Sequence, residues 1–247
     1  MVFILLPVYN EEKNLPGLLE KIRQQMQKGE DSYQLIAYND GSNDLSLELL
    51  TGYKNSLPIT IISGEKNMGL GVALDSLLKQ SIALSSADKD IAVVLDSDDT
   101  HNPELVPLMT DKLKEGFDVV IASRYLPKSR VFGVSWFRQL LSIGASWLMR
   151  ILFPIKGVRD YTSGYRAYSI GCLRMGYGKF GGNLIEEESF ACMAELLIKL
   201  RSINIKAIEI PIVLRYDRKL GKSKMKILKT ILKTITMLYR VGNITKV

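Results

Sequence analysis

The sequence of 247 residues is poor in side chains that support thiol, disulfide or imidazole chemistry. It has two cysteines, Cys172 and Cys192, and a single histidine, His101. Because neither cysteine stands in a CxxC spacing, the sequence excludes a disulfide scaffold and argues against a zinc site. Such sparing use of cysteine is typical of a reducing compartment, and we expect a cytoplasmic protein.

Long apolar runs are also missing. No stretch approaches the roughly 18 uninterrupted apolar residues that a membrane-spanning helix needs, and the first residues lack the basic flank of a signal peptide. The sequence has no internal repeat, low-complexity segment or Gly/Ser linker. Its 47% apolar and 24% charged residues exclude disordered, collagen-like and coiled-coil chains. We therefore predict a single domain over residues 1–247.

The balance of charge favours an anionic partner. Lys and Arg number 33 and Asp and Glu number 26, so the formal charge is +7. The basic residues are dispersed and no nucleic-acid-binding motif is present, so we expect no nucleic acid as partner.

Short apolar runs alternate with longer amphipathic stretches in the first half of the chain. The runs lie at 3–6, 35–38, 59–62, 91–95 and 119–122. This alternation predicts an α/β fold with a mostly parallel central sheet flanked by helices. Residues 15–27 place Leu15, Leu18, Leu19 and Ile22 on one face, which predicts a helix that covers the sheet.

After residue 125 the pattern changes. We expect helices at 136–153, 189–200 and 223–240, a loop-like segment at 161–168 and a strand at 205–214. The carboxyl-terminal helices are amphipathic.

Polar residues follow the apolar runs at 9–12, 39–42 and 96–99, and ligands of open α/β sheets bind beyond the carboxyl ends of strands. Asp96 and Asp98 project to the same side of extended backbone, where both can hold one Mg²⁺ or Mn²⁺. Thr100 offers a further hydroxyl. The alternative is an acidic loop in which Asp99 or Asn102 caps the next helix.

Seven short motifs run in one order along most of the chain. They are 7–14 (PVYNEEKN), 39–42 (NDGS), 96–98 (DSD), 123–125 (SRY), 138–142 (RQLLS), 163–166 (SGYR) and 218–224 (RKLGKSK). This ordered set resembles glycosyltransferase family 2 and, within it, the polyprenyl-phosphate (dolichol-phosphate) mannosyltransferase group. Two positions depart from the group's pattern: Asn39 replaces an Asp, and Thr100 stands where many members have Gln.

The resemblance implies a glycosyltransferase A-type domain. Residues 1–125 would bind the nucleotide sugar and metal, and residues 126–247 the acceptor and the membrane interface. It assigns the nucleotide sugar to Pro7, Tyr9, Glu11, Asp40, Asp96 and Lys224. It assigns the metal to Asp96 and Asp98. It assigns the acceptor phosphate to Arg124, Arg138 and Ser142. The catalytic set it implies is Asp98, Arg124, Arg138 and Arg218.

Chemistry agrees with a site rich in arginine. A phosphate acceptor has a second pKa of about 6, so its attacking oxygen is already charged at neutral pH and needs no general base. Guanidinium groups bind phosphate in a bidentate way without losing their charge. We therefore interpret His101 as a capping or surface residue. Arg124 alone is equally compatible with a surface salt bridge, and Glu195 either contacts the acceptor, orients an arginine or is simply solvated.

Two helices suggest contact with a lipid surface. In 136–153, Arg138, Ser142, Ser146 and Arg150 recur every fourth residue as a polar stripe between apolar flanks. The helix at 223–240 has an apolar face and a basic face. Either helix can lie at the headgroups of a membrane, and either can instead pack on the domain with its polar residues in water. Our hypothesis is peripheral attachment at the cytoplasmic face.

The leading prediction is a metal-dependent hexosyltransferase that moves a hexose, mannose from GDP-mannose by the resemblance, to a polyprenyl or dolichyl phosphate with inversion. The alternative within the family is transfer from a UDP- or GDP-sugar to a hydroxyl of a glycan or glycolipid. The QxxRW signature of processive members is absent. The intact aspartate pair argues against an inactive scaffold.

Overall fold

The structure, a computed structural model, describes residues 1–29, 31–218, 220 and 227–244. Its elements follow one another as β1 (Val2–Val8), α1 (Leu15–Gln27), β2 (Tyr33–Asp40), α2 (Ser46–Gly52), β3 (Ile59–Gly64), α3 (Leu70–Leu84), β4 (Ile91–Val94), α4 (Val106–Lys114), β5 (Val119–Ser123), β6 (Arg130–Phe132), α5 (Trp136–Leu152), β7 (Arg166–Ser169), α6 (Ile170–Lys179), α7 (Cys192–Arg201), β8 (Ala207–Pro211), β9 (Val213–Arg215) and α8 (Ile227–Ile244). Short 3₁₀ turns occupy Tyr53–Asn55, Pro103–Leu105 and Tyr216–Arg218.

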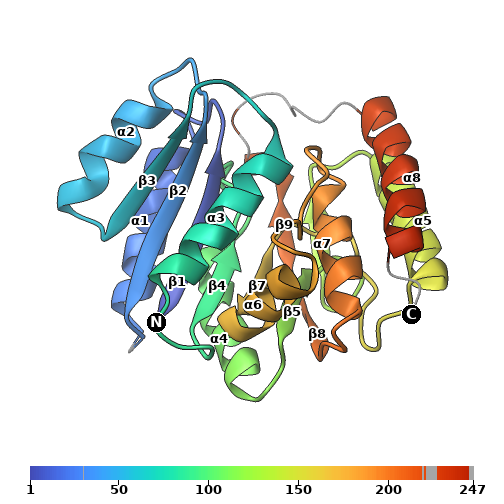
Figure 1. Cartoon of the computed structure of the whole chain (residues 1–247). Helices are drawn as coiled ribbons and strands as arrows, with labels where there is room; N and C mark the ends of the chain where they lie inside the picture. Colours follow the sequence, from blue (N-terminus) through green and yellow to red (C-terminus); the bar gives the residue numbers. More distant parts are fainter. Residues whose placement is uncertain (30, 219, 221–226, 245–247) are drawn as a thin grey trace.

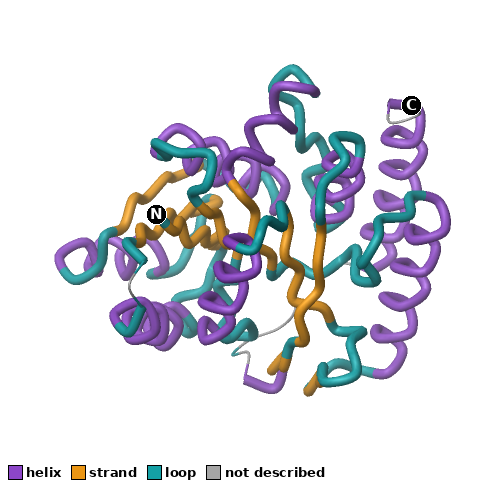
Figure 2. Tube along the Cα trace, turned by 90° about the horizontal axis from the view of Figure 1, so that it is seen from below, coloured by secondary structure: helices purple, strands orange, loops and turns teal. Residues whose placement is uncertain are grey.

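One seven-stranded sheet organises the chain, in the order β3-β2-β1-β4-β7-β5-β8. Its strands run parallel except β7, which is antiparallel to both neighbours. Helices cover both faces (Figures 1 and 2). Helices α1, α2 and α4 pack on one face, and α3, α6 and α7 pack on the other. The predicted mostly parallel α/β sheet is confirmed, as are its first five strands and the helix Leu15–Gln27.

Strand β7 corrects the loop predicted at 161–168. The strand is four residues long and begins at Arg166, whose polar side chain hides the strand pattern. Arg166 is fully buried, and its guanidinium donates to the carbonyl oxygens of Tyr161 at 2.7 Å and Met193 at 2.5 Å. The arginine of the SGYR motif therefore lies in the core and links β7 to the backbone at Tyr161 and Met193.

The strand predicted at 205–214 is two strands. β8 extends the main sheet beside β5, whereas β9 pairs with β6 in a separate two-stranded sheet. Between them the buried residue Ile212 packs with the α1/α4 side of the core, and its carbonyl accepts from the N–H of Arg130. A continuous apolar run cannot reveal this change of sheet.

Both cysteines are buried and free, and burial raises the pKa of each thiol. The expectation that they form no disulfide is confirmed. In the described part of the chain, no helix is long and apolar enough to cross a membrane.

Candidate active site

The carboxyl ends of β1, β2, β4 and β5 open into one cavity of about 1040 Å³, which α5 and α8 extend on its far side. Its wall includes nine of the eleven predicted site residues: Pro7, Tyr9, Glu11, Asp40, Asp96, Asp98, Arg124, Arg138 and Ser142. Lys224 and the side chain of Arg218 lie outside the described residues. Every predicted site residue whose side chain the structure describes therefore lines the same cavity, as the sequence predicted.

The residues after β1 are fixed by the turn after β2. The N–H groups of Asn10 and Glu11 donate to the hydroxyls of Ser42 and Ser46, at 3.0 and 2.8 Å. The side-chain amide of Asn14 donates to the Glu11 carboxylate at 2.6 Å. The same amide donates to the carbonyl of Leu220 and accepts from its N–H, each at 3.2 Å. Leu220 belongs to the RKLGKSK motif, and Asn14 anchors this one residue of the motif next to Glu11. Sequence analysis assigned Asn14 no such role.

Asp40 organises the entry to α3. Its carboxylate accepts from the N–H groups of Met68 and Gly69, at 2.8 and 3.0 Å, and from the side chain of Asn67 at 2.9 Å. Gly41 follows in the left-handed region, with φ +64°, where an added Cβ would lie 2.5 Å from the backbone of Lys66. The glycine of the NDGS turn is thus required by the close approach of two backbones.

Asp96 and Asp98 lie just after β4 and face the same cavity. Ser97 between them donates its hydroxyl to the carbonyl of Pro7 at 2.7 Å, which ties the pair to the end of β1. Thr100 is buried and donates its hydroxyl to Asp98 at 2.7 Å. Its placement orients Asp98, and Asn102 is the residue that caps the following turn, through the N–H of Glu104 at 3.2 Å.

The donor set suits a hard divalent cation. Two carboxylates on one wall of a nucleotide-sized cavity match the way Mg²⁺ is held by one or two carboxylates and completed by substrate phosphates. Within the described chain, no cluster of three or more His, Cys, Asp or Glu residues forms a closed protein cage. The residues present therefore fit Mg²⁺ or Mn²⁺ bound together with a diphosphate.

His101 corrects the expectation of a capping or surface residue. The ring is 4% exposed and stacks on Tyr165, with ring centres 4.9 Å apart. Its Nδ1 accepts a hydrogen bond from the backbone N–H of Asp96 at 3.1 Å. The capping function belongs to the neighbouring Asn102.

Arg124 is held in place by a buried acid. Its guanidinium makes a bidentate contact with Asp160 at 2.7 and 2.8 Å, and donates to the hydroxyl of Thr162 at 2.6 Å. Burial acts to raise the pKa of Asp160, but the charge and hydrogen bonds of Arg124 outweigh it and hold that pKa below its usual value. Burial likewise opposes the charge on Arg124, and the charge of Asp160 raises its pKa. Arg124 therefore does not form the surface salt bridge considered from the sequence. It pairs with the buried Asp160, which orients its guanidinium.

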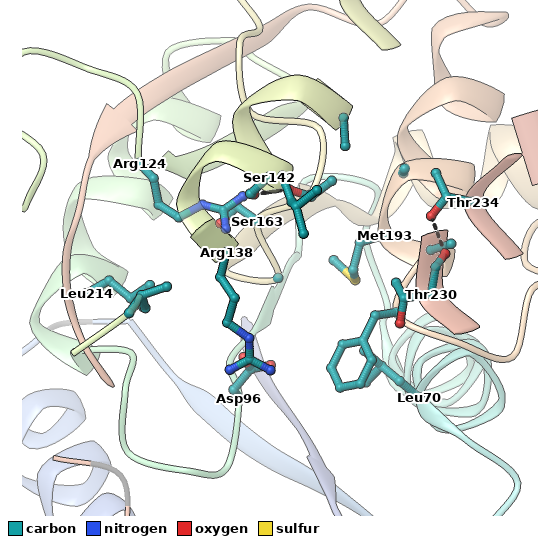
Figure 3. Close-up of a pocket in the computed structure, with 18 of the residues that line it drawn as sticks. Leu70, Asp96, Arg124, Arg138, Ser142, Ser163, Met193, Leu214, Thr230 and Thr234 are labelled. Carbon is teal, nitrogen blue, oxygen red and sulfur yellow. Dashed lines mark hydrogen bonds between the residues drawn. The ribbon is translucent and has the colours of Figure 1, made fainter. Parts of the chain in front are cut away.

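A small cluster of hydroxyl groups lies beside this guanidinium. Ser142 on α5 accepts from the Tyr125 hydroxyl at 3.0 Å and lies 3.3 Å from the Thr162 hydroxyl. Arg138, one turn earlier on α5, points across the cavity toward Asp96 (Figure 3). Asp160, Thr162 and Tyr125 were not among the predicted site residues. Tyr125 belongs to the SRY motif, and the signal for Asp160 and Thr162 was proximity in sequence to the SGYR motif.

Helix α5 lies with its polar stripe inward. Arg138 and Ser142 face the cavity and Ser146 is buried, whereas Arg150 is exposed at the end of the helix. The apolar residues that α5 exposes are Trp136, Phe137, Leu140, Ile143, Trp147, Leu148, Ile151 and Leu152. Five of them, Trp136, Phe137, Leu140, Ile143 and Leu148, also border the cavity. The reading in which the polar stripe of α5 meets water is therefore wrong for Arg138, Ser142 and Ser146 and holds for Arg150.

Helix α8 likewise turns basic side chains toward the domain. Lys233 lies 3.4 Å from Glu187, and Arg240 donates to Glu195 at 2.8 Å, so both cations face the domain. Ile231, Leu232, Ile235 and Tyr239 are exposed. Helices α5 and α8 occupy the same end of the molecule (Figure 1), and the ring of Phe153, just after α5, lies within 3.5 Å of a Cβ added at Gly242. Their exposed residues form what we name the apolar end.

Glu195 is fully buried and is not solvated. Besides Arg240, its carboxylate accepts from the N–H groups of Glu186 and Glu187, at 2.9 and 2.8 Å, and lies 3.2 Å from Lys199. Of the three roles considered, the structure places Glu195 as the residue that orients an arginine.

Comparison with known proteins agrees with this geometry. The model of the family "Glycosyl transferase family 2" matches residues 3–175. The chain belongs to glycosyltransferase family 2.

Two curated relatives match most of the chain. Dolichol-phosphate mannosyltransferase of Pyrococcus furiosus is 30% identical over 97% of the chain, and the chain spans 63% of that protein. Polyprenol monophosphomannose synthase of Mycolicibacterium smegmatis is 26% identical over 90% of the chain and 80% of the relative. These relatives confirm the resemblance to the polyprenyl-phosphate mannosyltransferase group.

Solved structures share the fold. Glucosyl-3-phosphoglycerate synthase from Mycobacterium tuberculosis, in complex with Mg²⁺ and uridine diphosphate, superimposes with a TM-score of 0.68 at 20% identity, over 98% of this chain and 79% of that one. The glycosyltransferase A-type architecture predicted from the motifs is confirmed.

Proposed function

We propose that this glycosyltransferase transfers a hexose, with inversion, from a nucleoside diphosphate sugar to a polyprenyl phosphate at the cytoplasmic surface of a membrane. Mannose from GDP-mannose is the donor we propose first, because two curated relatives are named for mannose transfer to dolichol or polyprenol phosphate. A third relative, from Proteus mirabilis, is named for transfer of a modified arabinose to undecaprenyl phosphate, and is 33% identical over 57% of this chain and 40% of its own length. The acceptor class is thus common to all three names, while the sugar differs.

The observation that carries the proposal is the composition of the cavity at the carboxyl ends of the strands. Carboxylates line one part of its wall, an oriented guanidinium with hydroxyl groups lines another, and apolar side chains of α5, α7 and α8 line the rest. A nucleoside diphosphate, a phosphate and an isoprenoid chain require these three kinds of surface. A hydroxyl of a soluble glycan as acceptor would leave the apolar part without a use.

On the donor side, Pro7, Tyr9, Glu11 and Asp40 would hold the nucleoside, and Asp96 and Asp98 would hold Mg²⁺ or Mn²⁺. When bound, the cation would neutralise the negative charge that grows on the departing diphosphate. Arg218 and Lys224 would add positive charge on the same side, because Asn14 anchors Leu220, which lies between them, next to Glu11.

On the acceptor side, Arg124 would donate to the phosphate through Nη1, because Asp160 and Thr162 occupy Nε and Nη2 and hold the guanidinium in its orientation. The hydroxyls of Ser142 and Thr162 would donate to the same group. Arg138 projects between the two sides and would reduce the repulsion between donor diphosphate and acceptor phosphate. No residue needs to remove a proton, since the attacking phosphate oxygen is already charged at neutral pH.

The apolar end would place this cavity at a lipid surface. Monomeric soluble proteins seldom expose a large continuous apolar patch without a binding function. The outward apolar sides of α5 and α8 border the mouth of the acceptor part, where a polyprenyl chain leaves its phosphate.

A transfer assay tests the proposal. Radiolabelled GDP-mannose, GDP-glucose, UDP-glucose and UDP-galactose are each offered with polyprenyl phosphate, polyprenol or a soluble glycan, with Mn²⁺ or with chelator. We expect product only with the lipid phosphate and a divalent cation. Asp98→Asn should lower turnover by at least about a hundredfold.

Asp99→Asn is the matched control. Asp99 is the next residue, has φ +60° that Asn also tolerates, and pairs with Lys21 away from the cavity. It should leave turnover within a fewfold of the unmodified enzyme. Product on the glycan or on polyprenol would overturn the proposed acceptor.

A further inference from the structure

His101, the one histidine of the chain, lies beside Asp96, the first aspartate of the proposed metal pair. We assign it no role as a general acid or base. Its Nδ1 is occupied by the N–H of Asp96, at 3.1 Å. In the neutral ring the proton then sits on Nε2, which faces the Asp96 carboxylate at 3.7 Å. Both nitrogens of His101 are thus directed at the same residue, one at its backbone and one at its side chain.

The ring itself is rigidly supported. One face stacks on Tyr165, which is fully buried and whose hydroxyl donates to the carbonyl of Asn102 at 2.9 Å. The carbonyl of Tyr165 accepts in turn from the N–H of Ala122 in β5, at 3.0 Å. His101 is therefore clamped between the turn that follows the aspartates and the segment that leads into β7.

Asp96 is enclosed from the other side as well. An added Cβ at Gly164, the residue before Tyr165, would lie 3.3 Å from Asp96 Oδ1. A side chain there would press on the carboxylate. The ring of His101 and the backbone of Gly164 thus both lie close to the carboxylate, which is 34% exposed toward the cavity.

We propose that His101 is a positioning residue for Asp96: it fixes the backbone and carboxylate of this aspartate in the orientation that receives the divalent cation of the donor complex. The proposal rests on the metal role of Asp96 given above. Side chains that orient metal-binding carboxylates contribute strongly to affinity, and their loss commonly weakens metal binding by about 10- to 100-fold. His101 acts through Asp96 and touches neither the acceptor nor the diphosphate.

Three variants separate the two contacts of the ring. His101→Phe keeps a ring for the stack on Tyr165 but removes both nitrogens. His101→Asn loses the stack but keeps an acceptor close to the position of Nδ1. Tyr165→Phe keeps the stack and removes only the hydroxyl that binds the Asn102 carbonyl.

The primary measurement is Mn²⁺ binding in the presence of GDP or UDP, followed by electron paramagnetic resonance of free Mn²⁺ on the full chain. We expect His101→Phe to weaken Mn²⁺ binding about tenfold or more, His101→Asn to recover part of that loss, and Tyr165→Phe to bind within about threefold of the unmodified protein. In the transfer assay, His101→Phe should raise the Mn²⁺ concentration needed for half-maximal rate, with the KM for polyprenyl phosphate unchanged. Thermal melting of each variant reports whether it is folded.

Two results would overturn the inference. One is Mn²⁺ binding by a folded His101→Phe variant within twofold of the unmodified protein. The other is a His101→Asn variant, folded, that binds no better than His101→Phe, since the acceptor to the Asp96 N–H would then be without effect. If the unmodified protein itself bound no Mn²⁺ with either nucleotide, the metal role in the proposed function would fail instead.

Discussion

The guanidinium of Arg240 on α8 lies 2.8 Å from the carboxylate of Glu195 on α7, which is completely buried. This contact sets the rotation of α8 about its axis. Arg240 and Lys233 are turned toward acids of the domain, and Met237, Leu238 and Val241 are buried on the same helix. The apolar residues that remain, Ile231, Leu232, Ile235 and Tyr239, are exposed. The exposure of these α8 residues, which belong to the apolar end, therefore follows from ion pairs and buried apolar contacts on the opposite side of the helix.

Loss of the Glu195 charge should destabilise the fold. Glu195→Gln keeps the shape of the side chain but leaves the fully buried Lys199 and the partly exposed Arg240 without this counter-charge. Breaking a buried ion pair by removing one partner typically costs about 3–5 kcal/mol, and we expect the lower end because Lys199 also contacts Glu186. Urea denaturation followed by circular dichroism measures the loss.

Lys114→Met is the control for this substitution. Lys114 pairs with Asp31 across the surface, where both side chains are well exposed, so its loss should cost no more than about 1 kcal/mol. Equal destabilisation by the two substitutions would show that the Glu195 cluster has no special role.

Asp160 should make the free energy of unfolding depend on pH in the acid range. Its folded pKa is depressed by Arg124, so its contribution to stability is present above the unfolded pKa of about 3.9 and is lost as pH falls from there toward the folded value. Unfolding free energies of the unmodified protein and Asp160→Asn, compared between pH 6 and pH 3, should converge as pH falls. A difference that stays constant over this range would contradict the assignment.

The first turn of α3 offers a prediction on close packing. A Cβ on Gly71 would lie 1.8 Å from the carbonyl oxygen of Glu187, so Gly71→Ala must push the Glu187 segment away from α3. We expect a loss of about 1–3 kcal/mol in unfolding free energy and weaker donor binding, since Asp40 holds the residues just before this helix.

Gly17→Ala provides the matched comparison. Gly17 lies inside α1 with no atom within 4 Å of an added Cβ, so alanine there should stabilise by about 0.5–1 kcal/mol. We expect urea denaturation to show that Gly71→Ala lowers the free energy of unfolding and that Gly17→Ala raises it. Stabilisation at Gly71 would mean that the contact with Glu187 is loose.

The sequence predicted most of what depends on local pattern. The apolar runs placed β1 to β5, and the spacing of Leu15, Leu18, Leu19 and Ile22 gave α1 with its buried face. The order of the motifs placed the acidic and basic parts of the cavity. These features follow from periodicity and from the rule that strand ends carry the site.

The sequence could not show which side of an amphipathic helix faces the domain. Periodicity in α5 and α8 defines two faces, but only the buried acids of α7 and the cavity decide that the polar faces turn inward. Arg166, Glu195 and His101 likewise read as ordinary polar residues, because their burial depends on partners that lie far away in the sequence. Strand β7 was missed for the same reason, since it opens on a buried arginine.

The apolar end should bind membranes through its aromatic residues. Trp147 on α5 is 65% exposed, and moving a side chain of this size from water into a lipid interface is worth about 1.5–3 kcal/mol, or roughly tenfold or more in affinity. Trp147→Ser should therefore weaken sedimentation with liposomes of phosphatidylglycerol and phosphatidylcholine by about that factor. Leu45→Ser is the control, because Leu45 is similarly exposed, at 58%, just before α2 at the opposite end of the molecule (Figure 1). Equal loss with both variants, or an unmodified protein that sediments no more with liposomes than without them, would contradict membrane binding by this end.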